Sequence, residues 1–297
     1  MVERPSKVGV VTVTYNSGDV IEDFMESMLS QSYEIFILYI VDNASTDDTL
    51  GRLKNYDDSR IVILPNNTNV GVAAGNNQGI EKAVSNECGH ILLINNDVEF
   101  EQSMLEKLMD SMSKCNCDVI VPKMIYHDNK SLIWFAGGYF SKWKGYSNYH
   151  IGMNEHDNGQ YDYQKQIQYA PTCCMLIKKC VFDIVGIMDE KYFVYFDDTD
   201  FCYRLYKHNI SMYYYPHIDF YHKVSSLTGG LESHFTIRHM IRNKVYYLLK
   251  QNNVLKYIYC VLFYIKTITC FVFSKRFKKN YDVFKLINLS FVEGFYL

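Results

Sequence analysis

The chain has 297 residues, of which 48% are hydrophobic and 21% charged, so it can bury a sizeable core and is not a disordered chain. The formal net charge of −3 is unevenly distributed, because residues 238–285 hold eleven Lys or Arg against a single acid. An acidic body with a basic, aromatic C-terminal region suggests that this region meets an anionic surface. No nucleic-acid-binding motif accompanies the basic residues, so we expect no nucleic-acid partner.

The nine cysteines form neither a disulfide framework nor the paired Cys-x-x-Cys spacing of zinc sites. Free thiols in a reducing cytosol are the simpler interpretation. The first sixteen residues contain no long apolar segment, so we expect no secretory signal peptide. These features predict a cytoplasmic protein, with the basic C-terminal region available for peripheral contact at the inner face of the cell membrane.

Strands and helices are expected to alternate strictly through the first 122 residues. The expected strands are 7–14, 35–41, 60–64, 91–94 and 119–122. The expected helices are 19–31, 46–55, 70–85 and 102–113, the first capped by Asp19 and the second by Ser45 or Thr46. This alternation predicts an α/β fold with a Rossmann-like, mostly parallel central sheet flanked by helices.

The second half of the chain is less regular. Strands are expected at 132–139, 169–178 and 211–215, and the segment 220–223 follows the last of them. Helices are expected at 179–185, 201–208 and 231–250. The polar segment 141–168 is interpreted as a long loop over the site. We therefore divide the chain into residues 1–122 and 123–230, which form two halves of one domain, and a C-terminal helical extension, 231–297.

Polar residues follow the buried apolar strand 91–94 directly, in the order Asn95, Asn96 and Asp97. In open α/β sheets, ligands bind at the carboxyl ends of parallel strands. A carboxylate with two neighbouring amides suits a hard divalent cation that carries a diphosphate. A simple turn favours the same residue types, so this segment alone does not decide between the two interpretations.

Polar loops also follow the first two strands. Asp42 follows the second strand and should face the base, where it can accept a hydrogen bond from N3–H of uracil or thymine; the alternative is a helix N-terminal acid. The Gly- and Asn-rich segment 69–77 opens a helix, and its glycines and helix N-terminus favour a nearby diphosphate.

Several motifs in the correct order resemble those of family 2 glycosyltransferases with the GT-A fold, and the resemblance covers residues 7–250. The motifs are Val13-Thr14-Tyr15-Asn16, the segment 41–47, Asn69-x-Gly71 with Gly75-Asn76-Asn77, the segment 93–97, the segment 175–190, and Phe196-Asp197-Asp198-Thr199-Asp200. The chain looks closest to the rhamnosyltransferase-like branch that builds bacterial surface polysaccharides. It departs from the family in carrying Asn95-x-Asp97 for the usual Asp-x-Asp, and Asp197-Asp198 for the usual Glu-Asp.

The resemblance implies specific roles for individual residues. The implied nucleotide-sugar contacts are Thr14, Tyr15, Asn16, Asp42, Asn69, Gly71, Asn77, Asn95 and Asn96. Asp97 is the implied ligand of Mn²⁺ or Mg²⁺, and His222 is a second candidate ligand, although a lone His is as often a core residue. Asp198 is the expected general base, with Asp197 and Asp200 as alternatives; a capping cluster at a helix start would look the same.

We therefore expect an inverting, metal-dependent glycosyltransferase that uses a UDP- or dTDP-sugar of the rhamnose, galactose or glucose type. The expected acceptor is a hydroxyl of a surface polysaccharide, a glycoprotein glycan or a lipid-linked oligosaccharide. The rival hypotheses are a nucleotidyltransferase, which would need a Gly-rich opening after the first strand, and a non-catalytic glycan-assembly scaffold.

The C-terminal region 253–297 allows two interpretations. Its apolar run, 257–265, is interrupted by Lys266 and is shorter than the ~20 residues of a spanning helix. A basic cluster follows at 274–279, which suits an interfacial helix on an anionic leaflet. Alternatively, the region forms a helix pair that packs on the body or on a second subunit, as in a homo-oligomer.

Overall fold

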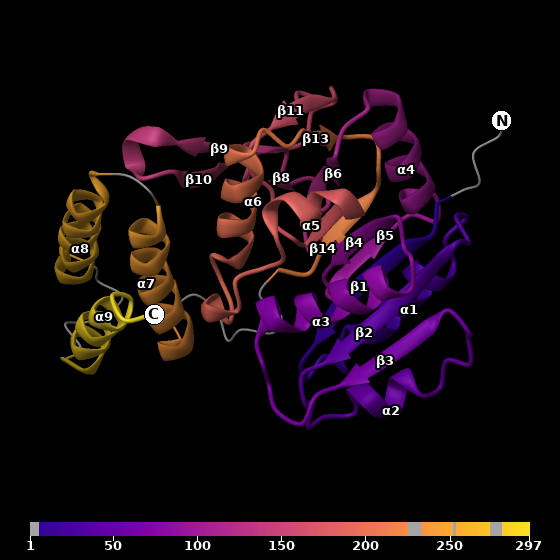
Figure 1. Cartoon of the computed structure of the whole chain (residues 1–297), viewed down its shortest axis with the longest axis horizontal. Helices are drawn as coiled ribbons and strands as arrows, with labels where there is room; N and C mark the ends of the chain where they lie inside the picture. Colours follow the sequence, from indigo (N-terminus) through magenta and orange to yellow (C-terminus); the bar gives the residue numbers. More distant parts are fainter. Residues whose placement is uncertain (1–5, 225–232, 252–253, 274–280) are drawn as a thin grey trace.

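The computed structural model describes residues 6–224, 233–251, 254–273 and 281–297. Its centre is an eight-stranded sheet with the order β11-β13-β6-β12-β4-β1-β2-β3 (Figure 1). The strands are β1 (Val8–Thr14), β2 (Phe36–Asp42), β3 (Ile61–Pro65), β4 (His90–Ile94), β6 (Val119–Pro122), β11 (Lys165–Ile167), β12 (Cys174–Lys178) and β13 (Met212–Tyr215). The expected α/β architecture and the five expected strands of the first half are confirmed.

The sheet is parallel in its first half and mixed in its second. Strand β1 pairs in parallel with β2 and β4, and β2 with β3. Strand β12 enters between β4 and β6 and runs antiparallel to both. The carboxyl ends of β1, β2 and β4 consequently share one edge, as the sequence analysis expected.

Helices in the first 207 residues flank the sheet (Figure 1). They are α1 (Ile21–Leu29), α2 (Thr49–Leu53), α3 (Val72–Ser85), α4 (Met104–Cys115), α5 (Lys179–Val185) and α6 (Asp197–Lys207). The predicted caps were wrong. Val20, and not Asp19, directly precedes α1. Helix α2 begins only at Thr49, whose backbone N–H and hydroxyl both donate to Asp47. Helix α6 begins at Asp197, four residues earlier than predicted.

The structure differs from the prediction between residues 132 and 168, and the segment predicted as a long loop contains regular structure. The expected strand 132–139 is divided into β8 (Ile133–Phe135) and β9 (Gly138–Ser141), because Gly137 has a φ of +110° between them. Strand β9 forms an antiparallel hairpin with β10 (Ser147–His150). A second sheet has the order β5-β14-β7-β8, with β5 (Val98–Phe100), β14 (Phe220–His222) and β7 (Met124–Tyr126).

Three helices form the C-terminal extension: α7 (His234–Lys250), α8 (Lys256–Phe273) and α9 (Tyr281–Glu293). Helix α7 lies against the body, and α8 and α9 lie on the side of α7 away from the sheet (Figure 1). Within the described residues, α8 is the one helix long and apolar enough to cross a membrane, with 18 residues and a mean hydropathy of 1.4. By this criterion the expectation that the apolar run is too short was wrong. The basic cluster 274–279 lies outside the described residues.

Candidate active site

The carboxyl ends of β1 and β2 place Thr14 directly opposite Asp42. The Thr14 hydroxyl donates to Asp42 Oδ1 at 2.9 Å, and the Ser45 hydroxyl donates to the same oxygen at 2.6 Å. The Ser45 backbone N–H donates to Asp42 Oδ2 at 3.0 Å. The Asp42 carboxylate is therefore fixed and fully buried, and a nucleotide base could reach it only after a local rearrangement.

The loop after β1 is fastened to the loop after β2. Asn16 has a φ of +51°, and its side-chain oxygen accepts from the Thr46 backbone N–H at 2.8 Å. The Asn16 backbone N–H donates to the Ser45 hydroxyl at 2.9 Å. The neighbouring Tyr15 side chain is 44% exposed, so its ring is free to contact a ligand at this edge.

The segment 69–77 approaches other parts of the protein closely. Asn69 accepts from the Gly71 N–H at 2.9 Å, and Gly71 has a φ of +88°. A Cβ at Gly71 would lie 2.5 Å from the Phe193 carbonyl oxygen, so glycine is required for this approach. The Asn77 side chain is buried and bonds to the N–H and the carbonyl of Met188. We therefore assign Asn77 to holding the segment after α5, and not to nucleotide binding.

The residues after β4 differ in their surroundings. The buried Asn96 amide donates to the Val13 carbonyl at 2.7 Å and so ties the end of β4 to the end of β1. The Asn95 backbone N–H donates to the Cys173 carbonyl at 3.0 Å, and its side chain is half-buried.

Asp97 and His222 meet although they are far apart in the sequence. Strand β14 pairs His222 with Val98, and this pairing places His222 Nε2 3.3 Å from Asp97 Oδ1. Both side chains are nearly buried, at 10% and 8% exposure. His222 Nδ1 is also buried and has no hydrogen-bond partner among the described residues.

These two residues fit a divalent cation as a partial ligand set. Oxygen and imidazole nitrogen ligands each lie about 2.0–2.2 Å from such a cation, so donors 3.3 Å apart can share one. The described part of the chain contains no cluster of three or more His, Cys, Asp or Glu that could hold a metal. A cation at this position would therefore complete its coordination with water and phosphate oxygens, as Mg²⁺ commonly does.

The start of α6 presents Asp198 between two hydrogen-bond donors. The Thr199 backbone N–H donates to Asp198 Oδ1 at 2.6 Å, and the Tyr169 hydroxyl donates to Oδ2 at 2.8 Å. Burial raises the pKa of Asp198, and the bonds from Tyr169 and Thr199 partly oppose this rise. Burial and the Asp198 charge raise the pKa of Asp197 to about 7. A carboxylate with a raised pKa is a better proton acceptor near neutral pH.

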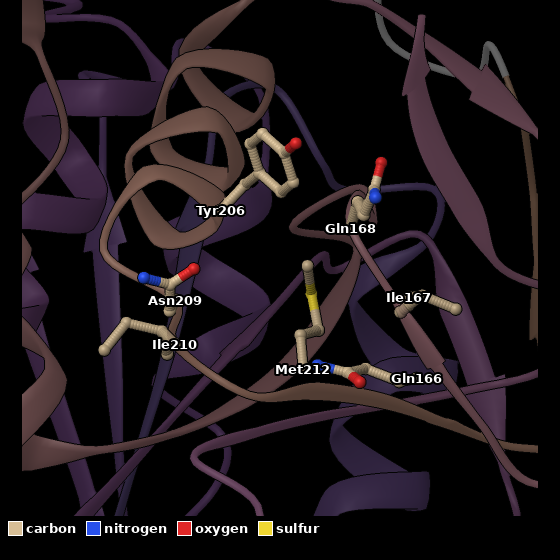
Figure 2. Close-up of a pocket in the computed structure, with 7 residues that line it drawn as sticks. All are labelled: Gln166, Ile167, Gln168, Tyr206, Asn209, Ile210 and Met212. Atoms are coloured by element: carbon tan, nitrogen blue, oxygen red, sulfur yellow. The ribbon is translucent and has the colours of Figure 1, made fainter.

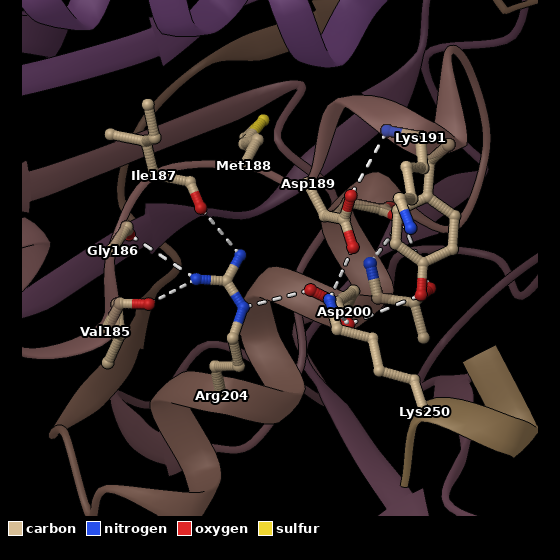
Figure 3. A network of polar contacts seen from close by, with 12 residues as sticks. Val185, Gly186, Ile187, Met188, Asp189, Lys191, Asp200, Arg204 and Lys250 are labelled. Carbon is tan, nitrogen blue, oxygen red and sulfur yellow. Dashed lines mark hydrogen bonds and ion pairs between the residues drawn. The ribbon is translucent and has the colours of Figure 1, made fainter. Parts of the chain in front are cut away.

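Asp200 belongs to a separate ionic network (Figure 3). Its carboxylate accepts from Arg204 Nε at 2.9 Å and from Lys250 Nζ at 2.9 Å. Lys250 also pairs with Asp189 at 2.7 Å. The Arg204 guanidinium donates to the carbonyl of the last residue of α5 and to those of the two residues that follow it. The expectation that Asp200 could replace Asp198 as the base is not favoured, because both of its oxygens are paired with cations.

Aromatic and imidazole rings connect the pair formed by Asp97 and His222 with Asp198. The Trp134 ring lies 4.4 Å from the His222 ring and 5.5 Å from the His150 ring. The His150 ring lies 5.4 Å from that of Tyr169, which donates to Asp198. Sequence analysis identified none of these three residues, because Trp134, His150 and Tyr169 lay in a predicted strand or loop without a motif of their own.

Comparison with known proteins identifies the family. Residues 9–185 match the family described as glycosyl transferase family 2. The chain belongs to this family. It is 23% identical over 238 residues to the low-salt glycan biosynthesis hexosyltransferase Agl10 of Haloferax volcanii, covering 80% of this chain and 74% of the relative. It is 25% identical to the N-acetylglucosaminyl-diphospho-decaprenol L-rhamnosyltransferase of Mycobacterium tuberculosis, covering 77% and 80%.

Solved structures confirm the GT-A fold of this family 2 glycosyltransferase. The S. aureus TarS 1-349 complex with UDP aligns with a TM-score of 0.54 and 17% identity, covering 91% of this chain and 73% of TarS. GalNAc-T7 with UDP, GalNAc and Mn²⁺ aligns with a TM-score of 0.62 and 14% identity, covering 82% of this chain and 50% of GalNAc-T7.

A pocket of about 280 Å³ in this glycosyltransferase lies apart from the residues described above (Figure 2). It lies between β11, β13, the C-terminal end of α6 and the residues that follow α6. Its lining residues are Gln166, Ile167, Gln168, Tyr206, Asn209, Ile210 and Met212. None of them is titratable except Tyr206, so this pocket lacks the carboxylates that sugar transfer needs.

Proposed function

We propose that this family 2 glycosyltransferase transfers a sugar from a UDP- or dTDP-sugar to a glycan hydroxyl with inversion, using Asp198 as the general base. The observation that carries the proposal is the position of Asp198, which is half-buried at a helix start, held by Tyr169, and raised in pKa by burial. The relatives of this chain act in glycan synthesis, and this supports the proposal that the acceptor is a glycan.

The reaction that we propose needs one base and no acid from the protein. The acceptor oxygen attacks the anomeric carbon and its proton passes to Asp198, while the bond from that carbon to the diphosphate oxygen breaks. The electron pair leaves with the nucleoside diphosphate, whose low pKa makes a second carboxyl group unnecessary. A positioned base of this kind typically contributes about 10²–10⁴ in rate.

Asp97 and His222 would hold the divalent cation. When bound, the cation supplies positive charge that stabilises the leaving diphosphate. An imidazole ligand favours Mn²⁺ over Mg²⁺, and the presence of Mn²⁺ in the GalNAc-T7 structure supports this preference.

We assign the nucleotide to the edge formed by the ends of β1, β2 and β4. Thr14, Tyr15, Asn16, Asp42, Asn69, Gly71, Asn95 and Asn96 belong to this edge or to the adjoining start of α3. Tyr15 and Asn16 are the exposed residues of this set and Asn95 is half-buried, whereas the buried Asp42 and Asn96 hold the loops. Structural neighbours that contain UDP or UDP-GlcNAc support this assignment.

The acceptor is proposed to be lipid-linked, with the enzyme at the inner face of the membrane. Two relatives are named for polyprenyl-diphosphate acceptors. Helix α8 presents six apolar side chains that are each more than half exposed: Tyr257, Ile258, Val261, Leu262, Ile265 and Phe273. This face and the basic residues of 231–297 suit an anionic leaflet. A second copy of the chain is the other partner that could cover the face. In this proposal, residues 1–122 form the nucleotide-sugar-binding half of the domain, and residues 123–230 form its acceptor-binding and catalytic half.

Product analysis tests the proposal. The enzyme would be incubated with a panel of UDP- and dTDP-sugars and polyprenyl-diphosphate acceptors, with Mn²⁺ and with a chelator. We expect free nucleoside diphosphate and a glycoside of inverted anomeric configuration by NMR, both dependent on the cation. Release of pyrophosphate, or a glycoside of retained configuration, would contradict the proposal.

A further inference from the structure

The segment immediately before the candidate base has an unusual backbone. Phe193, Tyr195 and Phe196 have φ angles of +63°, +64° and +68°. Residues other than glycine, asparagine and aspartate seldom adopt a positive φ, and bulky ones least of all. Such residues persist where the surrounding structure holds them. Because Asp197 and Asp198 follow directly, whatever holds segment 191–196 also sets the direction of the base.

Two consecutive side chains of α7 hold the carbonyl groups of this segment. The Asn243 amide nitrogen lies 2.8, 2.7 and 2.9 Å from the carbonyl oxygens of Tyr192, Val194 and Tyr195. Arg242 Nη2 donates to the carbonyls of Lys191 and Tyr192 at 3.2 and 3.0 Å.

The Phe193 carbonyl is held from the nucleotide side, by the start of α3. The Phe193 carbonyl accepts from the Val72 N–H, at the start of α3, at 2.6 Å. Every carbonyl from Lys191 to Tyr195 is thus bonded to α3 or α7. Buried backbone carbonyls without such partners are costly, so these bonds can maintain a conformation that the aromatic residues would not adopt alone.

Asn243 is built for this contact. Its side chain is fully buried, and its oxygen accepts from Arg242 Nε at 2.8 Å. That bond fixes the orientation of the amide, so that its N–H groups face the carbonyls.

The aromatic side chains of the segment also pack on α7. The Phe193 ring stacks on His239 with centroids 5.4 Å apart, and the Phe196 ring lies 5.9 Å from Tyr247. The Tyr195 and Thr236 hydroxyls lie 3.3 Å apart. Helix α7 therefore contacts both the backbone and the rings of the residues with positive φ.

We propose that Asn243, assisted by Arg242, is a positioning residue that sets the geometry of Asp198, so that α7 of the C-terminal extension completes the active site. This inference rests on the proposed function, in which Asp198 is the base. It also gives the extension a role in turnover that is independent of any membrane contact made by α8.

The test compares Asn243→Ala with a matched control, Gln251→Ala. Gln251 is also buried, at the C-terminal end of α7, and donates to a backbone carbonyl, that of Gly145, at 3.0 Å. Both variants remove a buried amide that donates to backbone carbonyls, three for Asn243 and one for Gln251, but only Asn243→Ala releases the segment before Asp198. Calorimetry with UDP and dTDP would count the binding sites and measure their affinity, and nucleoside diphosphate release would give kcat and KM with the preferred donor.

We expect Asn243→Ala to lower kcat per nucleotide-binding site by about 10–100-fold, because small displacements of a catalytic group have effects of this size. Its nucleotide affinity and donor KM should change little, and Gln251→Ala should keep the wild-type kcat. A wild-type kcat in Asn243→Ala, or an equal loss in both variants, would overturn the inference. If Asn243→Ala does not fold, Arg242→Ala is judged by the same criterion. An inactive wild type would instead reject the proposed function.

Discussion

Asp198 is distinguished from an ordinary surface carboxylate by its immediate neighbours. Tyr169 and Thr199 donate to its two oxygens, so both the direction and the proton affinity of the carboxylate are set by the protein. Burial raises its pKa above the ordinary value of 3.8, whereas the Tyr169 bond lowers it. The active form of a base is the deprotonated one, and activity should therefore fall as the pH drops through this raised pKa.

Tyr169→Phe should move the acidic limb of the pH–kcat profile to higher pH. The substitution removes a donor that stabilises ionised Asp198, so the pKa of Asp198 rises further. We also expect kcat at neutral pH to fall by about threefold to tenfold. A hydrogen bond to a charged group is worth about 1.5–3 kcal/mol, and only part of this energy is lost when the Asp198 carboxylate is held less firmly. An acidic limb that stays in place or moves to lower pH would show that Tyr169 does not act on the base.

Asp197→Asn should stabilise the fold at alkaline pH. The pKa of Asp197 is raised from 3.8 to about 7 in the folded state, so the folded protein holds a proton that the unfolded chain releases. This contribution favours folding at low pH and is lost as the pH rises from 3.8 towards 7. The neutral Asn avoids that loss. Thermal unfolding at about pH 8 should show a midpoint raised by at least about 3 °C, with little gain at about pH 4. Equal shifts at both pH values would contradict this account.

At the scale of elements, apolar runs predicted strands well, and short polar segments were harder to interpret. Ser45 is a good capping residue by type, yet its hydroxyl bonds to Asp42 and α2 starts later. The segment 141–168 looked like a loop because it is polar, but β10 pairs with β9 and β11 pairs with β13 through backbone hydrogen bonds that side-chain polarity does not report.

The exposed face of α8 gives a prediction at the same scale. Replacing Val261 and Leu262 together by Glu should lower sedimentation with vesicles of phosphatidylglycerol and phosphatidylcholine by at least about tenfold. Each apolar side chain that becomes buried in the bilayer contributes about 1.5–3 kcal/mol to membrane binding. Ile184→Glu, at a half-exposed apolar position of α5, is the matched control and should leave sedimentation unchanged. Unchanged vesicle binding in the double variant, with a shift from dimer to monomer by light scattering, would instead identify the face as a subunit interface.

For the whole molecule, the order of motifs along the chain was enough to predict the family and the GT-A fold. The ends of β1, β2 and β4 had to share an edge once those strands were known to be parallel. Contacts between distant segments could not be predicted in this way. The approach of Trp134 to His222, and of Asn243 to segment 191–196, depends on how β8, β14 and α7 pack, which no local pattern encodes.

The central claim is that one carboxylate at the start of α6 accepts the proton of the acceptor, and Asp198→Asn tests it most directly. Asn keeps the size of the side chain and removes its basicity. We expect kcat to fall by about 10²–10⁴ while the affinity for UDP or dTDP stays at the wild-type value. Asp183→Asn, an exposed carboxylate on α5, should be as active as the wild type. Turnover by Asp198→Asn at the wild-type rate would contradict the account.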